Sequence, residues 1–204
     1  MDQTFPGTDG YAAEAPGLIE RYETLPFDAV HAPVLHLMPS RPVSILDIGA
    51  GAGRDAAHLA ALGHSVVAAE PTAPFIDAAR ASHAQSGVLW LQDGLPDLAQ
   101  VRDLDRTFDL ILLTAVWMHL DEAERGRAMP VVAAMLAPAG RLIMMLRYGP
   151  VPSGRRMFQI PRDETRALAA AQGLELVHDS WNLAIREPNR GLGVHWNRLA
   201  FERP

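Results

Sequence analysis

Three glycines stand at alternate positions just after an aspartate in the stretch SILDIGAGAGRD. Asp47 comes first, and Gly49, Gly51 and Gly53 follow it. A residue without a Cβ lets the backbone approach a ligand closely. A helical pattern that begins at Arg54 would present its free N–H groups at the same place. This combination suits the binding of a nucleotide-like ligand at the end of a strand.

The dinucleotide-binding fingerprint G-x-G-x-x-G is the first pattern to compare with this turn. Counted from Gly49, its third glycine would fall at position 54, where the chain has Arg54. The mismatch argues against a nicotinamide-dependent dehydrogenase. A lone glycine motif is weak evidence for or against a cofactor, so the dehydrogenase stays as a lesser alternative. A tight strand-to-helix turn that binds nothing is the plain structural alternative.

Apolar patterning around the turn predicts alternating strands and helices. Strands are expected at 43–49, 64–70, 88–93, 108–117, 141–149, 174–181 and 194–202, and helices at 54–63, 73–84, 128–140 and 162–173. Residues 1–16 are expected to have little fixed structure, and 17–38 to form helical stretches broken at Pro26 and Pro33. Such alternation favours a parallel sheet with helices on both faces, which binds ligands at the carboxyl ends of its strands.

Composition narrows the function classes. The chain has 204 residues, 49% of them hydrophobic, a net charge of −6 and no cysteine. It therefore predicts a single soluble domain, without disulfides, a cysteine nucleophile or a thiolate metal site. The acidic balance disfavours binding to nucleic acid. No signal peptide and no membrane-spanning run is recognised, so a cytoplasmic protein without membrane partners is expected.

The segment LDIGAGAGRDA resembles the first motif of class I S-adenosylmethionine-dependent methyltransferases. In that family an acidic residue after the second strand holds the ribose, and another after the third strand lies near the adenine. Glu70 and Asp93 stand at these places. The resemblance covers roughly residues 43–147 and implies S-adenosyl-L-methionine as the cofactor. The residues that it implies for cofactor binding are Asp47, Gly49, Ala50, Gly51, Gly53, Glu70, Pro71, Asp93, Gly94 and Thr114.

The resemblance also implies the architecture. The fold would be α/β, with a doubly wound, mostly parallel, Rossmann-like sheet of seven strands whose final strand is antiparallel. Residues 1–204 would form one methyltransferase domain. Within it, 1–42 would be an N-terminal helical lid, with 17–40 covering the site, and 43–204 the core. Residues 147–162 would form an insertion on the substrate side.

In this family the cofactor carries the reactive methyl, so the protein mainly positions the two reactants and excludes water. His119 follows the fourth strand and is the candidate base; a surface or capping histidine is the alternative. Tyr22 and Trp117 are candidates to line the substrate pocket, and packing in the core or under the lid is the favoured alternative for Trp117. Arg147 and Arg155, with Arg156 beside them, would suit an acidic substrate unless they are solvated loop charges.

The expected acceptor is a small molecule. The residues TAVW at 114–117 differ from the Asn-Pro-Pro-Tyr type of motif of enzymes that methylate exocyclic amines of bases. No metal site is expected, because His31 and His36 have no carboxylate cluster beside them in the sequence. A monomer or homodimer is expected. The remaining alternative is a protein of the same fold that senses S-adenosylmethionine or uses it without methyl transfer.

Overall fold

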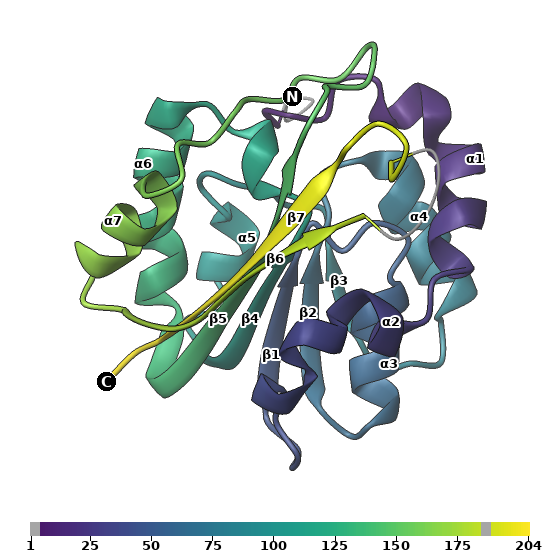
Figure 1. Cartoon of the computed structure of the whole chain (residues 1–204). Helices are drawn as coiled ribbons and strands as arrows, with labels where there is room; N and C mark the ends of the chain where they lie inside the picture. The colour runs from purple at the N-terminus through teal and green to yellow at the C-terminus, as the bar shows by residue number, and fades with distance from the viewer. Residues whose placement is uncertain (1–4, 185–188) are drawn as a thin grey trace.

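The computed structural model describes residues 5–184 and 189–204, which form a seven-stranded sheet with helices on both faces (Figure 1). The strand order is β3-β2-β1-β4-β5-β7-β6, and β7 alone is antiparallel to both of its neighbours. The strands are β1 (Ser44–Ile48), β2 (Ser65–Ala69), β3 (Leu89–Leu91), β4 (Phe108–Thr114), β5 (Leu136–Tyr148), β6 (Glu175–Leu183) and β7 (His195–Glu202). The predicted doubly wound fold with an antiparallel final strand is confirmed.

The helices form two layers on opposite faces of the sheet (Figure 1). One layer holds α1 (Tyr11–Glu23), α2 (Phe27–His31), the 3-10 helix η1 (Ala32–Leu37), α3 (Arg54–Ala61) and α4 (Ala73–Ser82). The other holds α5 (Ala99–Arg102), α6 (Glu122–Ala134) and α7 (Glu164–Ala170), and the short 3-10 helix η2 (Trp117–His119) follows β4. Each layer packs its own apolar cluster against the sheet, so β1 and β4 are buried on both faces.

Two sequence predictions are wrong in their boundaries. The expectation of little fixed structure up to residue 16 fails from Tyr11 onward, because α1 buries Ala15 and Leu18 and continues past Pro16. The helix expected at 128–140 is displaced toward the N-terminus. Asp121 caps α6 in a reciprocal capping box, and β5 already begins at Leu136.

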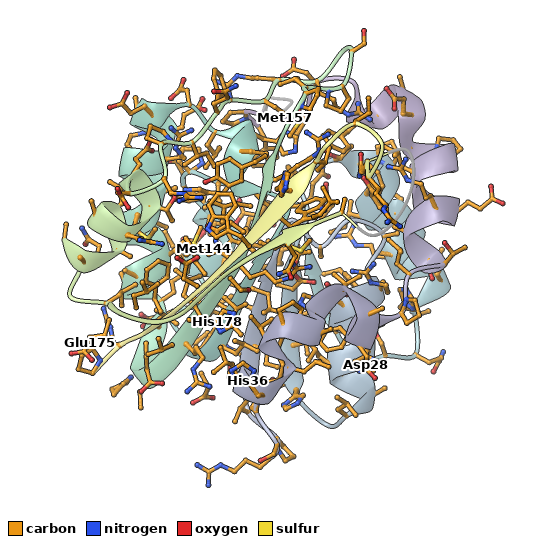
Figure 2. All side chains as sticks on the ribbon, in the orientation of Figure 1. Asp28, His36, Met144, Met157, Glu175 and His178 are labelled. Atoms are coloured by element: carbon orange, nitrogen blue, oxygen red, sulfur yellow. The ribbon has the colours of Figure 1, made fainter. Side chains whose placement is uncertain are left out.

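Strand register places the ends of β1 and β4 in one row with residues of β5 and β7. Thr114 of β4 pairs with Met145 of β5, which pairs with Arg198 of β7. β1 ends one residue before the level of Thr114, at Ile48, so the glycine turn begins in the same row. Met157 lies near this edge, whereas His36 lies at the opposite end of the molecule (Figure 2). The carboxyl ends of the parallel strands therefore converge where a ligand would bind.

Candidate active site

The turn after β1 requires its glycines for two different reasons. Gly49, Gly51 and Gly53 have φ of 73°, 57° and 92°, a region that residues with a Cβ rarely adopt. A Cβ on Gly49 would lie 2.3 Å from a methyl of Val116, and one on Gly53 would lie 2.5 Å from the ring of Trp90. A Cβ on Gly51 would meet no atom closer than 4.0 Å. Gly49 and Gly53 therefore permit close packing, whereas Gly51 leaves open space beside the cavity.

Two buried carboxylates flank this turn. Glu70 accepts hydrogen bonds from the backbone N–H groups of Gly51 (2.9 Å) and Thr72 (2.8 Å), so it ties the end of β2 to the turn. Burial raises the pKa of Glu70, and these backbone donors counteract part of that rise. Asp47 is 2% exposed, and its Oδ2 has no hydrogen-bond partner. Burial, followed by the nearby Asp55 carboxylate, raises the pKa of Asp47 well above its usual range.

A row of buried polar contacts lies beside the glycine turn. Asp55 lies 2.8 Å from Nε2 of His31 and 2.7 Å from Nε of Arg54. Burial acts to raise the pKa of Asp55, but the hydrogen bonds to His31 and Arg54 outweigh it and hold the value at about 2. These contacts link α2 to the start of α3 and so hold the N-terminal segment against the glycine turn. Arg54 and Asp55 were not among the predicted site residues, although they directly follow the motif.

A cavity of about 1060 Å³ opens over this edge of the sheet. Its walls come from the glycine turn, α1, α2, the strand ends and the loop that follows β5. Of the predicted residues it is lined by Asp47, Gly49, Ala50, Gly51, Glu70, Pro71, Gly94, Thr114, Tyr22, His119, Arg147 and Arg155. Residues lining it that were not predicted include Tyr11, Arg54, Met145, Asn182, Trp196 and Arg198. One cavity thus unites most of the predicted cofactor and substrate residues.

His119 faces this cavity with both ring nitrogens engaged. Its Nδ1 lies 2.8 Å from the backbone oxygen of Arg156, which can only accept, so Nδ1 carries the proton. Its Nε2 lies 3.0 Å from the hydroxyl of Tyr11, which therefore donates to it. Burial, assisted by Arg155 and Arg147, lowers the pKa of His119, while the bond to the Arg156 oxygen raises it. The imidazole is consequently neutral at neutral pH and capped by Tyr11.

Tyr11 comes from α1 and was missed because the N-terminal sixteen residues read as irregular. Burial raises the pKa of its hydroxyl. The guanidinium of Arg155 lies 3.9 Å from the centre of its ring, and Arg155 also forms a salt bridge of 2.8 Å with Glu14. The spacing of Tyr11, Ala15, Leu18 and Tyr22 is that of one helical face and is the signal that could have identified α1.

Three predicted site residues lie away from the cavity lining. Trp117 is 1% exposed in the core, where its indole N–H donates to the Thr165 hydroxyl at 3.1 Å. Asp93 is fully buried and accepts backbone hydrogen bonds from Gly94 and Val101, so it ties the chain after β3 to α5. Gly53 packs against the ring of Trp90 and does not line the cavity.

The three arginines predicted for the substrate side differ in whether a carboxylate pairs with them. Arg156 is held by the α6 cap residues Asp121 and Glu124, at 3.1 and 2.8 Å, and does not line the cavity. Arg155 is paired with Glu14. Arg147 is half-buried and donates to the backbone oxygen of Pro150 at 2.8 Å. Of the three predicted arginines, Arg147 is therefore the one that borders the cavity without a carboxylate partner.

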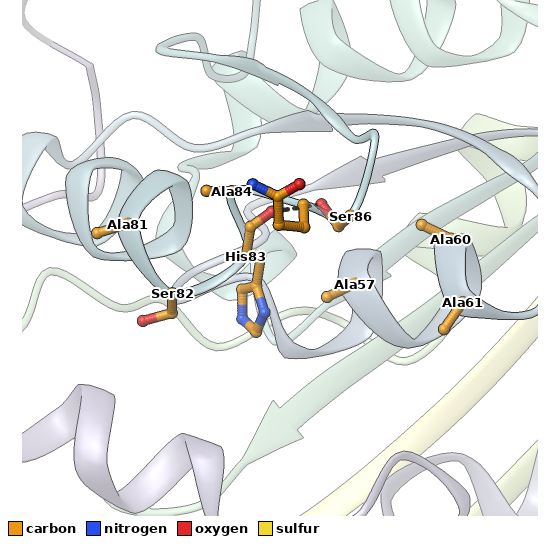
Figure 3. Close-up of a pocket in the computed structure, with 9 residues that line it drawn as sticks. Ala57, Ala60, Ala61, Ala81, Ser82, His83, Ala84 and Ser86 are labelled. Carbon is orange, nitrogen blue, oxygen red and sulfur yellow. Dashed lines mark hydrogen bonds between the residues drawn. The ribbon is translucent and has the colours of Figure 1, made fainter.

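A second hollow, of about 570 Å³, lies between α3 and the chain that ends α4 (Figure 3). Alanines make up most of its wall, with His83 as the titratable side chain. His83 lies 3.6 Å from the Glu23 carboxylate and borders Gly53, but none of the predicted cofactor or substrate residues lines this hollow. Within residues 5–184 and 189–204 there is no cluster of metal-ligating side chains, and no helix is long and apolar enough to cross a membrane.

Comparison with known families gives a match to the model of a methyltransferase domain over residues 45–140. Uncharacterized methyltransferases of Mycobacterium tuberculosis and Mycobacterium bovis are 34% identical over 106 residues. That stretch is 52% of this chain and 40% of each relative, so the match spans less than half the length of these proteins.

Solved structures with the same fold include several methyltransferases. The 1,6-didemethyltoxoflavin-N1-methyltransferase of Burkholderia thailandensis, crystallised with S-adenosylhomocysteine, superposes with a TM-score of 0.68 and 21% identity, covering 95% of this chain and 85% of that one. TehB of Haemophilus influenzae gives 0.71 and 13%, covering 94% and 67%. The predicted class I methyltransferase fold is confirmed, and residues 45–140 match the model of a methyltransferase domain.

Proposed function

We propose that this chain, which carries a methyltransferase domain with the class I fold, transfers a methyl group from S-adenosyl-L-methionine to a small-molecule acceptor. The observation that carries the proposal is the glycine turn with Asp47 and Glu70 buried beside it, at one end of a cavity large enough for two ligands. Tyr11, His119 and Arg147 line the same cavity.

The donor atoms beside the turn fit this cofactor. Its methionine part carries a positive ammonium and a positive sulfonium, and Asp47 presents a buried carboxylate oxygen without a partner. Glu70 uses its two oxygens on two backbone donors, which leaves further lone pairs to accept from a ribose diol. When bound, the cofactor supplies an electrophilic methyl group on sulfur. Gly51 would lie under the methionine part, and Pro71 and Gly94 would lie nearer the adenine.

The acceptor would meet Tyr11 rather than His119 itself. The Tyr11 hydroxyl donates to His119 Nε2, so that nitrogen has no free lone pair for a second donor. An acceptor proton would pass to the Tyr11 oxygen while the Tyr11 proton passes to Nε2. The Arg156 oxygen, which fixes the Nδ1 proton, would then hold the resulting imidazolium in place. This step refines the sequence interpretation of His119 as a direct base.

Water would be excluded by the N-terminal segment and the loop after β5. Tyr11, Leu18 and Tyr22 of α1 line the cavity, as do Pro152 and Met157 of the loop. The 1–42 lid and the 147–162 insertion thus remain proposals, supported by this shared lining. Enclosure matters because water would compete with the acceptor and weaken the electrostatic interactions that orient it.

The size of the cavity and the solved neighbours support a small acceptor. Two neighbours bear names of enzymes that act on small molecules, a didemethyltoxoflavin and a magnesium protoporphyrin. We propose neither compound for this chain, since both similarities are below 25% identity. A cytoplasmic location, a monomeric or homodimeric state and an acidic acceptor belong to the same proposal.

The direct test is a screen of a metabolite library for conversion of S-adenosylmethionine to S-adenosylhomocysteine. Mass spectrometry of each positive reaction should show an acceptor heavier by one methylene unit, about 14 mass units. Tight cofactor binding with no methylated product from any acceptor would favour the non-methylating alternative. Preference for a nicotinamide dinucleotide over S-adenosylhomocysteine would contradict the proposal altogether.

A further inference from the structure

Arg198 of β7 is a buried cation whose charge has no partner among the described residues. Its side chain lines the cavity, yet the residue is only 8% exposed. One nitrogen, Nη2, donates to the backbone oxygen of Val30 at 3.1 Å. Nε and Nη1 are buried without any hydrogen-bond partner. By contrast, two other cavity arginines, Arg54 and Arg155, each form a salt bridge with a carboxylate.

An uncompensated buried guanidinium is costly to a folded protein. Arginine retains its charge in proteins, and buried charges are normally paired with an opposite charge. Burial lowers the pKa of Arg198, because removing the guanidinium from water disfavours its charged form. The backbone oxygen of Val30 accepts one hydrogen bond but carries no net charge. A group with a negative charge would therefore complete this end of the cavity.

The position of Arg198 places it on the acceptor side. It pairs directly with Met145, which pairs with Thr114 at the end of β4, and all three line the cavity. Because neighbouring strands lie about 4.8 Å apart, Arg198 is roughly 10 Å from β4 and roughly 14 Å from β1. The glycine turn and Glu70 follow β1 and β2, so the proposed cofactor site is centred three to four strands away from the backbone of Arg198.

The surroundings of Arg198 define the rest of the ligand. Trp196 precedes it by two residues and therefore lies on the same face of β7, opposite Asn182 of β6. Met145, Trp196 and Pro33 add apolar surface to the same cavity. Arg147, opposite Trp196 on β5, adds a second cation to the same face. A ligand that matches this surface has an apolar body and an anionic end.

We propose that Arg198 is the anion-binding residue of the acceptor site, and that the acceptor is an apolar small molecule carrying an anionic oxygen group. Its anionic end would replace the missing partner of Arg198, and its methyl-accepting atom would lie toward Tyr11 and the end of β4. This inference rests on the proposed function for the identity of the second ligand. It adds Arg198 to the arginines that the sequence suggested for an acidic substrate, of which Arg155 already pairs with Glu14.

Binding of simple probe acids tests the inference without requiring turnover. The probes are phenylacetate, 3-phenylpropionate and 4-phenylbutyrate, each with its carboxamide, and 2-phenylethyl phosphate. Their affinity is measured by calorimetry, and their effect on the melting temperature by thermal shift, with and without S-adenosylhomocysteine. The acids should bind and raise the melting temperature, whereas the carboxamides should not. Whichever of carboxylate and phosphate binds more tightly identifies the anionic group.

Arg198→Met keeps the approximate length of the side chain and removes its charge. It should weaken acid binding about 10–100-fold, the loss expected for charge-assisted hydrogen bonds. Arg198→Lys should retain part of the binding. Arg141→Gln is the matched control, because Arg141 lies on β5 outside the cavity and already pairs with Glu202 at 2.6 Å; its acid affinity should equal that of the parent.

Folding failure is separated from loss of binding by the ligand-free melting temperature. Because Arg198→Met removes an unpaired buried charge, its melting temperature should equal or exceed that of the parent. Equal binding of acids and carboxamides by the parent, or parental acid affinity in Arg198→Met, would overturn the inference. A melting temperature that falls in Arg198→Met would also overturn it, since the guanidinium would then serve the fold. Acid selectivity without any binding of S-adenosylhomocysteine would refute the proposed function while leaving the anion site intact.

Discussion

Tyr11→Phe is the substitution that separates a proton relay from direct catalysis by His119. The change removes one oxygen and keeps the ring, which contacts Phe75 at 6.2 Å and lies beneath Arg155 at 3.9 Å between centroid and guanidinium carbon. The hydroxyl forms a hydrogen bond of 3.0 Å to His119 Nε2. Loss of a neutral hydrogen bond should lower the free energy of unfolding by about 0.5–1.5 kcal/mol, so the variant should remain folded.

The two mechanisms predict opposite effects on turnover. If Tyr11 passes the acceptor proton to His119, kcat should fall by the factor that general-base catalysis usually supplies, roughly 10²–10⁴. If the acceptor meets His119 directly, the substitution uncaps Nε2, and kcat should stay constant or rise. The structure favours the first outcome, because the tautomer fixed by the Arg156 oxygen leaves Nε2 as an acceptor already occupied by Tyr11.

The assay measures kcat at saturating cofactor and acceptor, using an acceptor identified by the product screen. S-adenosylhomocysteine affinity, measured in parallel, should not change, because the substituted oxygen lies on the acceptor side. Tyr148→Phe is a matched control, since Tyr148 lies on β5 outside the cavity and packs against Trp181 at 4.6 Å. Parental kcat in Tyr11→Phe, with the control also unchanged, would refute the relay.

Three further predictions concern the carboxylates and the histidine. Glu70→Gln retains an acceptor for only one of its two backbone donors, so calorimetry should show cofactor affinity reduced about 10–100-fold; parental affinity would remove Glu70 from the site. Asp93→Ala should lower the free energy of unfolding by about 2–4 kcal/mol in urea titration, because two buried backbone donors lose a charged acceptor, and it should leave affinity per folded molecule unchanged. Weaker cofactor binding without loss of stability would instead restore the sequence interpretation of Asp93. Since burial, with Arg155 and Arg147, lowers the pKa of His119 from its usual value, kcat/KM should be flat at neutral and alkaline pH and fall only in acidic solution, where the imidazole gains a proton; a rise with an inflection in alkaline solution would contradict a neutral resting imidazole.

The glycine turn and the carboxylates beside it could be predicted because their information is local in the chain. Asp47 and the glycines lie within seven consecutive residues, and the backbone conformation of the turn itself demands glycine. Glu70 follows the next strand along the chain, which pairs with β1, so chain order alone brings it to the turn. The alternation of strands and helices predicted a parallel sheet, and the carboxyl ends of its strands indicated the edge where a ligand would bind.

Asp93 shows where local information ends. The sequence QDG places a carboxylate after the third strand, but its direction depends on α5, a helix of four residues without a clear sequence signal. The carboxylate turns to the backbone N–H of Val101 in that helix. For Trp117 the apolar strand pattern already favoured packing in the core, and only its partner, the Thr165 hydroxyl of α7, depends on tertiary structure.

The acceptor end depends on contacts between distant segments, which no local pattern encodes. Tyr11 and His119 are separated by 108 positions, and their contact forms only when α1 folds over the ends of the strands. Arg198 shares the two-residue spacing of Trp196 and Ala200 in HWNRLAFE, so its face could be assigned from the sequence, but its lack of an ionic partner could not. Residues 185–188, between β6 and β7, lie outside the described residues.

Calorimetric titration of S-adenosylhomocysteine into Gly51→Ala, beside the parent and Gly173→Ala, tests the central claim that the cofactor lies on the glycine turn. Both glycines have positive φ, 57° and 75°, and a Cβ on either meets no atom closer than 4.0 Å, so both substitutions carry a similar backbone strain of about 1–2 kcal/mol. Only Gly51 lines the cavity. The parent and Gly173→Ala should bind one equivalent with equal affinity, and Gly51→Ala should bind about 10–100-fold more weakly, because its methyl group occupies ligand space. Equal affinity in all three proteins, or no binding by the parent, would contradict the claim.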